Sequence, residues 1–257
     1  MAYSTIDKSS SFMNPIIWTG DGGASRSITG VGFQPDMVWI KQRDGANNHM
    51  LADAVRGPDN KINPNTTSAN DTNTTSLTAF GADGFTAGTN TEINASGSTY
   101  VGWNWKAGTT SGISGGTITP TGYSINTTSG FGIYSYGGNS TSGATIAHGL
   151  GAVPEFIIIK ETSGTEDWLV GCKQRNWQHG FTLNTEAASV SSTTYWNDTD
   201  PTSTVFSLGN NDKCNVSGKT YMAYVWAPKA GFSAFGKYKG NGNSDGPFIY
   251  TGFKPAF

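Results

Sequence analysis

The stretch that decides the fold occurs twice: residues 32–41 read GFQPDMVWIK, and residues 151–160 read GAVPEFIIIK. Pro35 and Pro154 share one position of the two copies, and Lys41 and Lys160 share another. Each proline opens a short uninterrupted apolar run, which is typical of an inner β-strand. Proline can begin a strand but is not tolerated in its middle. The chain therefore repeats a unit built around such a strand.

Two further landmarks accompany this strand in both copies. Upstream, Trp18–Gly22 matches Tyr136–Asn139, an aromatic residue followed by a tight turn that glycine and asparagine favour. Downstream, YVGWNWKAG (residues 100–108) matches YMAYVWAPKAG (residues 221–231), and both alternate large and small residues as a strand does. Three landmarks in one order indicate two copies of one β unit, which should superpose with Trp105 on Trp226.

This repeat divides the chain into five segments. We expect an N-terminal arm over 1–12, a first β unit over 13–108, a Gly/Thr-rich linker over 109–129 and a second β unit over 130–231. Residues 232–257 repeat the first signals of a unit and are expected to form the start of a third unit or a C-terminal hairpin. Two strands alone are marginal in water. We therefore expect the second unit, a neighbouring subunit or further chain to hold this segment. In an oligomer the neighbouring subunit is favoured, with contacts at Phe248, Tyr250 and Phe253.

Composition supports an all-β chain. Of 257 residues, 35 are glycine, 12% are aromatic and only 13% are charged, where about 25% is usual. Short aromatic strands joined by long Gly/Ser/Thr/Asn-rich loops fit this pattern, so we predict tandem β-sandwich or jelly-roll units. Helical turns are expected only at 49–56 and near 185–190.

Charge and hydropathy limit the partners. The net charge of -2, with no basic run, argues against a nucleic-acid surface. No apolar run approaches about 18 residues, so no membrane insertion is expected. The N-terminus lacks the apolar segment of a secretory signal, and we expect synthesis in the cytoplasm.

No motif indicates catalysis, a cofactor or a metal. Gly112–Gly116 fits the Gly-x-Ser-x-Gly pattern of a nucleophile elbow but has neither the strand before it nor the helix after it. The three histidines lack the spacing of metal ligands. The carboxylates of the second unit lie mostly in polar loops, where solvation is expected. We therefore predict a protein that is not an enzyme, with no catalytic, cofactor-binding or metal-binding residues.

Aromatic residues outside the strands are the candidates for ligand contact. Trp177 and Trp196 are flanked by asparagine and glutamine in predicted loops, and tryptophan faces stack well on apolar or sugar rings. Within the strands, Trp39, Ile40, Trp105, Ile158 and Trp226 are predicted to be core. Asp53 and Arg56, three residues apart, are predicted to pair and to hold the polar loop 58–76. Cys172 and Cys214 are expected to be buried thiols, with one disulfide as the alternative.

The string of landmarks resembles a repeated β domain of virion structural proteins of marine tailed bacteriophages of the cyanophage and pelagiphage type. The segments that carry the resemblance are Met1–Asp7, Gly32–Lys41, His49–Gly57, Asp83–Phe85, Tyr100–Gly108, His148–Gly151 and Pro154. The resemblance implies a place in the virion, usually described as tail fibre or structural protein, and it implies no catalytic residues. The string His49–Gly57 has no counterpart in the second unit.

The resemblance and the repeat lead to one expected function and two alternatives. We expect a non-enzymatic virion structural protein, part of a fibre or surface appendage, that helps attach the particle to a host surface. By analogy with fibres, we expect a homotrimer bound to other virion proteins and assembled in the bacterial cytoplasm. The alternatives are a capsid decoration protein and a carbohydrate-binding module for a host-surface glycan.

Overall fold

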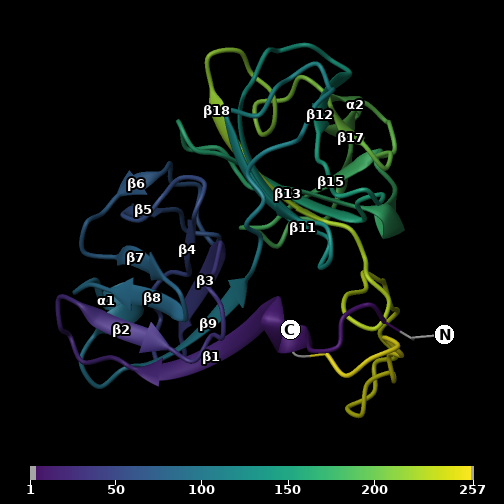
Figure 1. Ribbon diagram of the computed structural model, residues 1–257. Coiled ribbons are helices and arrows are strands. Elements are labelled where there is room, and N and C mark those ends of the chain that lie inside the picture. Colours follow the sequence, from purple (N-terminus) through teal and green to yellow (C-terminus); the bar gives the residue numbers. More distant parts are fainter. Residues whose placement is uncertain (1–3, 256–257) are drawn as a thin grey trace.

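The two apolar runs after Pro35 and Pro154 form inner strands of two antiparallel sheets. The computed structural model describes residues 4–255 (Figure 1). Strand β3 (Met37–Gln42) lies between β9 (Thr99–Trp105) and β4 (Met50–Asp53), and β13 (Phe156–Glu161) lies between β18 (Thr220–Trp226) and β14 (Leu169–Cys172). Each run therefore has a hydrogen-bonded neighbouring strand on both sides, so both are inner strands, as their continuous hydrophobicity predicts.

The two main sheets share one strand order. The first unit has the order β1-β9-β3-β4, with β1 at Met13–Thr19. The second has β11-β18-β13-β14, with β11 at Phe131–Gly137, and is extended on both sides. The added strands are β10 (Gly122–Asn126) beside β11, and β15 (His179–Thr182) and β16 (Val190–Ser191) beyond β14.

A smaller sheet covers the outer face of each main sheet. In the first unit it is β2 (Arg26–Thr29), β8 (Gly84–Ala87) and β7 (Leu77–Gly81). In the second it is β12 (Ala144–Ala147) and β17 (Val205–Leu208). A separate apolar core fills the space between the two sheets of each unit, so each unit is a β-sandwich. The chain also forms a short ladder of β5 (Asn60–Lys61) with β6 (Asp71–Thr72).

The registers confirm the repeat. Trp105 is paired with Met13 on one side and Met37 on the other. Trp226 occupies the same place between Phe131 and Phe156. In the main sheets, the first strand of each unit pairs with the last: β1 with β9, and β11 with β18. In the smaller sheets, the second strand pairs with the second-to-last: β2 with β8, and β12 with β17. A jelly roll has such nested pairing, but the direct β3–β4 and β13–β14 hairpins depart from one.

Polar side chains that bond to main-chain carbonyls repeat along with the strands. Lys41 Nζ donates to the carbonyls of Gln42 and Gly45, and Lys160 Nζ donates to those of Glu161 and Gly164. Asn94 Nδ2 donates to the Gly88 carbonyl, and Asn215 Nδ2 to the Gly209 carbonyl. These bonds satisfy main-chain groups of loops that leave the sheets, which is why each unit retains them.

In residues 4–255, helix is confined to single turns. Of the two expected helical positions, the one near 185–190 is wrong, whereas residues 54–56 of the other form a turn in which the Gly57 N–H donates to the Asp53 carbonyl at 3.1 Å. Residues 50–53 form β4, and 185–189 are irregular before β16. The turns that do form are η1 (Ser9–Ser11), α1 (Thr91–Asn94), η2 (Lys173–Arg175) and α2 (Thr193–Trp196). The side chain of Asn90 caps α1 and that of Ser192 caps α2, each accepting a main-chain N–H. The Asp83-Gly84 hairpin between β7 and β8 is confirmed.

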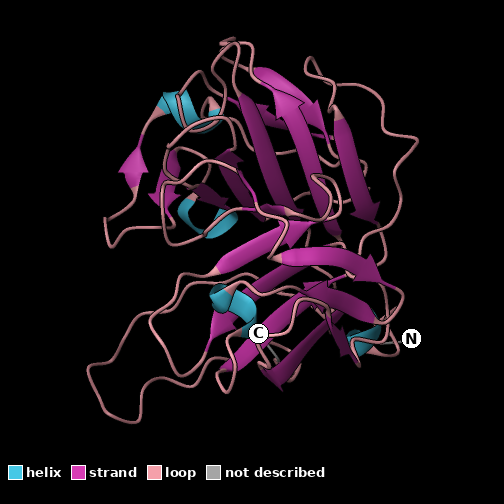
Figure 2. Ribbon diagram, turned by 90° about the vertical axis from the view of Figure 1, so that its left-hand side faces the viewer, coloured by secondary structure: helices cyan, strands magenta, loops and turns pink. Residues whose placement is uncertain are grey.

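The two units pack main sheet against main sheet (Figure 1). Met37, Leu51 and Trp105 of the first unit share one buried cluster with Phe131, Trp168 and Tyr224 of the second. Figure 2 shows the strands in successive layers. The linker is therefore not a flexible spacer, and its residues 122–126 belong to the second main sheet as β10.

The ends of the chain differ from their predicted form. Residues 232–255 contain no strand, so the expected C-terminal hairpin is wrong in this part, and only an isolated bridge joins Lys229 to Ser233. The described part of the N-terminal arm contains η1. Residues 1–3 of the arm and Phe257 lie outside the described residues.

Candidate binding site between the two units

The two tryptophans predicted to contact a ligand are buried inside the second unit. Trp177 is 3% exposed and Trp196 is 1% exposed. Their rings meet edge to face at 5.2 Å, and both pack against Gly171 of β14, where a Cβ would come within 2.6 Å of either ring. Because the missing side chain of Gly171 makes room for both rings, Trp177 and Trp196 are core, and their assignment to ligand contact is wrong.

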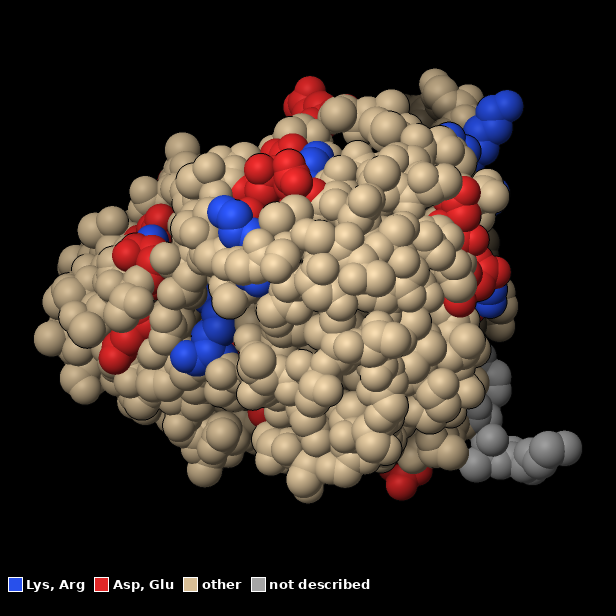
Figure 3. All heavy atoms as spheres, turned by 90° about the horizontal axis from the view of Figure 1, so that it is seen from above, with Lys and Arg blue, Asp and Glu red and all other residues tan. Residues whose placement is uncertain are grey.

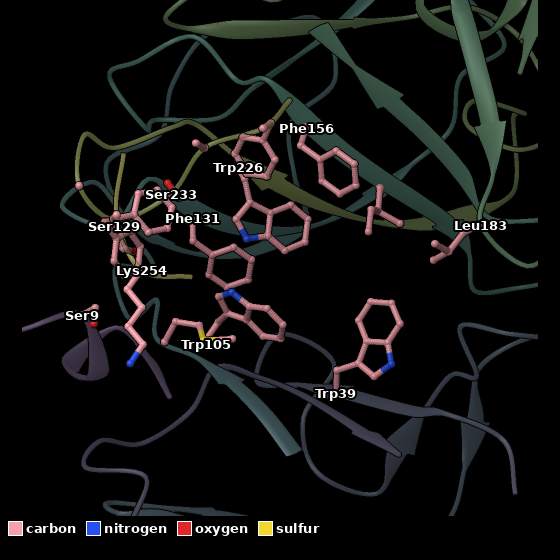
Figure 4. A pocket seen from close by; sticks show the side chains of 17 residues that line it. Ser9, Trp39, Trp105, Ser129, Phe131, Phe156, Leu183, Trp226, Ser233 and Lys254 are labelled. Carbon is pink, nitrogen blue, oxygen red and sulfur yellow. The ribbon is translucent and has the colours of Figure 1, made fainter. Parts of the chain in front are cut away.

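The aromatic side chains that line a cavity lie instead at the junction of the units. Figure 4 shows Trp39 and Trp105 of the first unit facing Phe131, Phe156 and Trp226 of the second. The cavity between them measures about 350 Å³. The ring of Trp226 lies 5.1 Å from that of Phe131 and 5.7 Å from that of Phe156. Ile40, Trp105 and Ile158 are buried as predicted, whereas Trp39 and Trp226 are half-buried because they face this cavity.

The C-terminal segment forms one wall of this junction cavity. The ring of Phe235 stacks on Phe156 with centroids 5.4 Å apart and planes at 4°. The Gln174 side chain donates to the Phe235 carbonyl at 2.6 Å. Phe232 meets Phe12 of the N-terminal arm at 6.2 Å. Side chains thus anchor a segment that has no strand of its own.

Polar groups gather at one end of the junction cavity. They belong to Ser9, Ser129, Ser233 and Lys254 (Figure 4). Ser129 is 3% exposed, and its hydroxyl oxygen has no hydrogen-bond partner among the described residues. Such a buried hydroxyl is uncommon in a folded protein.

The opposite end leads to a more polar hollow. Trp39 and Leu183 line both cavities, and the second, of about 370 Å³, is also lined by His49, Asn65 and Glu186. Trp39 Nε1 donates to His49 Nδ1 at 2.9 Å. Burial, and then the nearby Lys41, lower the pKa of His49 below its usual value. The imidazole is therefore neutral at pH 7, as its acceptor role requires.

A buried ion pair of the first unit is hydrogen-bonded to the second unit. Asp53 Oδ2 accepts from Arg56 Nε at 2.7 Å and from the Tyr224 hydroxyl of the second unit at 2.7 Å. Arg56 also donates to Asn70 Oδ1 at 2.8 Å, which ties down the loop that follows. The predicted Asp53–Arg56 pair and its hold on loop 58–76 are confirmed. The bond to Tyr224 crosses 171 residues of chain and was not predicted.

Three carboxylates of the second unit are paired with lysines. Lys173 lies 2.6 Å from Glu155, Lys213 lies 2.8 Å from Asp167 and Lys219 lies 3.1 Å from Glu161. Within residues 4–255, no group of three or more His, Cys, Asp or Glu is placed to hold a metal ion. Charges on the face shown in Figure 3 are scattered among uncharged residues. Cys172 and Cys214 are free thiols, and only Cys214 is buried.

Two of the three residues predicted to contact another subunit are exposed. Phe248 is 91% exposed and Tyr250 is 81% exposed, whereas Phe253 is half-buried and lines the junction cavity. Residues 130–231 therefore do not cover Phe248 or Tyr250. Their contact with another subunit stays a prediction.

Sequence reasoning missed most of the junction cavity, although a signal for it exists. Met13 and Met37 flank Trp105 in the first unit, whereas Phe131 and Phe156 flank Trp226 in the second. This exchange of methionine for phenylalanine at equivalent positions places the extra rings on one side of the junction. Nothing in the repeat indicates Ser129 or Lys254.

The fold and this junction define a class: a non-helical protein of two fused β-sandwich units with an aromatic cavity between them. The chain belongs to the family described as domain of unknown function DUF7483, whose model matches residues 8–257. The match includes both units and the C-terminal segment. No curated protein and no solved structure matches. Among the described residues, no helix is long and apolar enough to cross a membrane.

Proposed function

We propose that this protein is a non-enzymatic structural protein of a tailed-phage virion, which assembles into homo-oligomers of a fibre or surface appendage and helps attach the particle to its host. The observation that carries the proposal is the bare aromatic surface of the C-terminal segment. Tyr238, Phe248 and Tyr250 are each at least 70% exposed. Large apolar side chains exposed within one short segment favour contact with another protein.

The way the units are joined supports a structural role. The shared cluster and the Asp53–Tyr224 bond fix one unit against the other, so two similar surfaces are held at a constant angle. Copies of such a chain in an oligomer present many identical faces, and this raises the avidity of weak contacts. Every ion pair found within residues 4–255 lies inside one unit, so salt should do little to loosen the junction of the two units.

The carbohydrate-binding alternative loses its support. Its two tryptophans are core, and the walls of the junction cavity are mostly apolar. A sugar ring needs hydrogen-bond partners for its hydroxyls as well as an aromatic face. We therefore do not retain it as a second function.

The test of assembly compares the intact chain with a double variant, Phe248→Ser with Tyr250→Ser. Light scattering after gel filtration should show an oligomer, a trimer by the fibre analogy, that dissociates in the double variant. The control is Ile17→Ser, since Ile17 is 68% exposed on β1, outside the C-terminal segment. A chain that stays monomeric at high concentration, or a double variant that still assembles, contradicts the assembly.

The test of location is electron microscopy of particles labelled with an antibody against the chain. Label on a tail fibre or appendage supports the proposal. Label spread over the capsid supports the decoration alternative instead. Particles that carry no label contradict a place in the virion.

A further inference from the structure

We propose that the junction cavity is a binding site for an apolar molecule of two or three aromatic rings that carries one anionic group. The rings would lie among Trp39, Phe156 and Trp226, and the anion would lie at Ser129 and Lys254. This site is independent of the contact surface at Phe248 and Tyr250. A ligand there would join the two units and the C-terminal segment.

The size and walls of the junction cavity fit such a molecule. A cavity of about 150 Å³ holds benzene, and this one measures about 350 Å³, within the range of small-molecule pockets. Rings from both units face it, and Trp39 and Trp226 keep half-exposed apolar surface there. A flat apolar ligand would remove that surface from water, which favours binding.

The polar end indicates which group the ligand carries. Ser129 lines the cavity, and its covered hydroxyl has no hydrogen-bond partner in residues 4–255, so a ligand acceptor that comes within reach of it would satisfy this donor. In residues 4–255, no carboxylate lies within 4.0 Å of the Lys254 ammonium group. A hydroxyl donor and the exposed Lys254 cation at one end, with apolar walls beyond, are complementary to one anionic head on an apolar body.

The C-terminal segment provides a way in. Phe232, Phe235 and Phe253 contribute the wall on that side, and residues 232–255 have no strand. This wall can move away without breaking a sheet, because only side-chain contacts and a few hydrogen bonds hold it. Bound ligand would therefore hold the segment against the two units.

The experiment uses two fluorescent probes that differ only in charge. One is 8-anilinonaphthalene-1-sulfonate, and the other is N-phenyl-1-naphthylamine, which lacks the sulfonate. We expect the full chain to bind one sulfonate probe per subunit and to bind it more tightly than the neutral probe. Since a hydrogen bond to a charged group contributes about 1.5–3 kcal/mol, Ser129→Ala and Lys254→Gln should each weaken the sulfonate probe by about tenfold or more. Both variants should leave the neutral probe within about twofold.

A variant that fills the cavity separates this site from adventitious binding. Leu183→Trp should abolish binding of both probes, and Val153→Trp, at an exposed position of the second unit, should change neither. Binding lost in the Phe248→Ser/Tyr250→Ser variant but kept in Leu183→Trp would place the probe on the exposed segment and overturn the proposal. So would a Ser129→Ala protein that binds both probes as the natural chain does. Ser129→Ala removes an unpaired hydroxyl, so it should fold even where Leu183→Trp does not.

Discussion

Replacing Arg56 with methionine tests whether the buried ion pair secures the junction of the two units. The Arg56 side chain is 8% exposed and its partner Asp53 is fully buried. Burial alone would lower the pKa of Arg56, but the Asp53 carboxylate and the Tyr224 hydroxyl together outweigh burial, and the pKa is raised. The Arg56 guanidinium is therefore charged in the folded protein at neutral pH. Methionine keeps most of the volume of the side chain and removes its charge.

The expected loss of stability in Arg56→Met follows from the contacts that the Asp53 carboxylate keeps. The carboxylate would still accept the Tyr224 hydroxyl and the main-chain N–H groups of residues 55 and 56, but it would have no countercharge. Leaving one partner of a buried pair uncompensated costs about 3–5 kcal/mol of the free energy of unfolding. Arg26→Met is the matched control, because Arg26 pairs with the exposed Asp21 at 2.8 Å. An exposed pair contributes about 0–1 kcal/mol.

Guanidinium unfolding followed by tryptophan fluorescence measures both variants. We expect Arg56→Met to lower the unfolding midpoint strongly and Arg26→Met to lower it slightly. Adding Asp53→Asn to Arg56→Met should recover part of the loss, because the unpaired charge is then removed. A loss below about 1 kcal/mol in Arg56→Met, or no recovery in the double variant, would refute the reasoning.

Three further predictions concern the cores. Trp105→Ala should lower the free energy of unfolding by about 3–5 kcal/mol. Trp226→Ala should lower it by less, because Trp226 is half-buried. Equal losses for the two variants in denaturant titrations would count against this. Asn215→Ala should lower the free energy of unfolding by about 2 kcal/mol or more, because the carbonyls of Thr141 and Gly209 and the N–H of Asn139 lose their partner. Asn211→Ala, at a partly exposed asparagine nearby, is the comparison and should lower it by less. Burial raises the pKa of Cys214 from 9.0 to about 12, so a disulfide reagent at pH 8 should modify Cys172 well before Cys214. The unfolded chain releases the Cys214 proton near pH 9, and the folded chain does not. Stability from this group is therefore present below pH 9 and is lost as pH rises above it. Calorimetry checks the sign: above pH 9, the stability of Cys214→Ala should fall less steeply with pH than that of the natural chain.

Sequence reasoning succeeded where the deciding contacts are local or repeated. The prolines before β3 and β13, the turn at Asp83-Gly84 and the Asp53–Arg56 pair each depend on residues a few positions apart. The repeat then placed Trp105 and Trp226 at one register, because two copies with one pattern must bury the same faces.

It failed where burial depends on distant neighbours. Trp177 and Trp196 lie among polar residues in sequence, and only the packing against Gly171 of β14 makes them core. Residues 232–255 carry the aromatic pattern of a hairpin but form no strand. A β-ladder needs a neighbouring strand as well as a suitable sequence.

The amino-acid sequence by itself determined that the chain is all-β, that it contains two copies of one unit, and which strands lie inside each main sheet. Periodicity, turn residues and repetition are properties of the chain, and they act over short distances. The tertiary structure decided how the two main sheets meet, and with that the junction cavity, the Asp53–Tyr224 bond and the unpaired Ser129 hydroxyl. Those features arise between residues as far as 171 positions apart, where side-chain shape and the exclusion of water, and no local pattern, select the contacts.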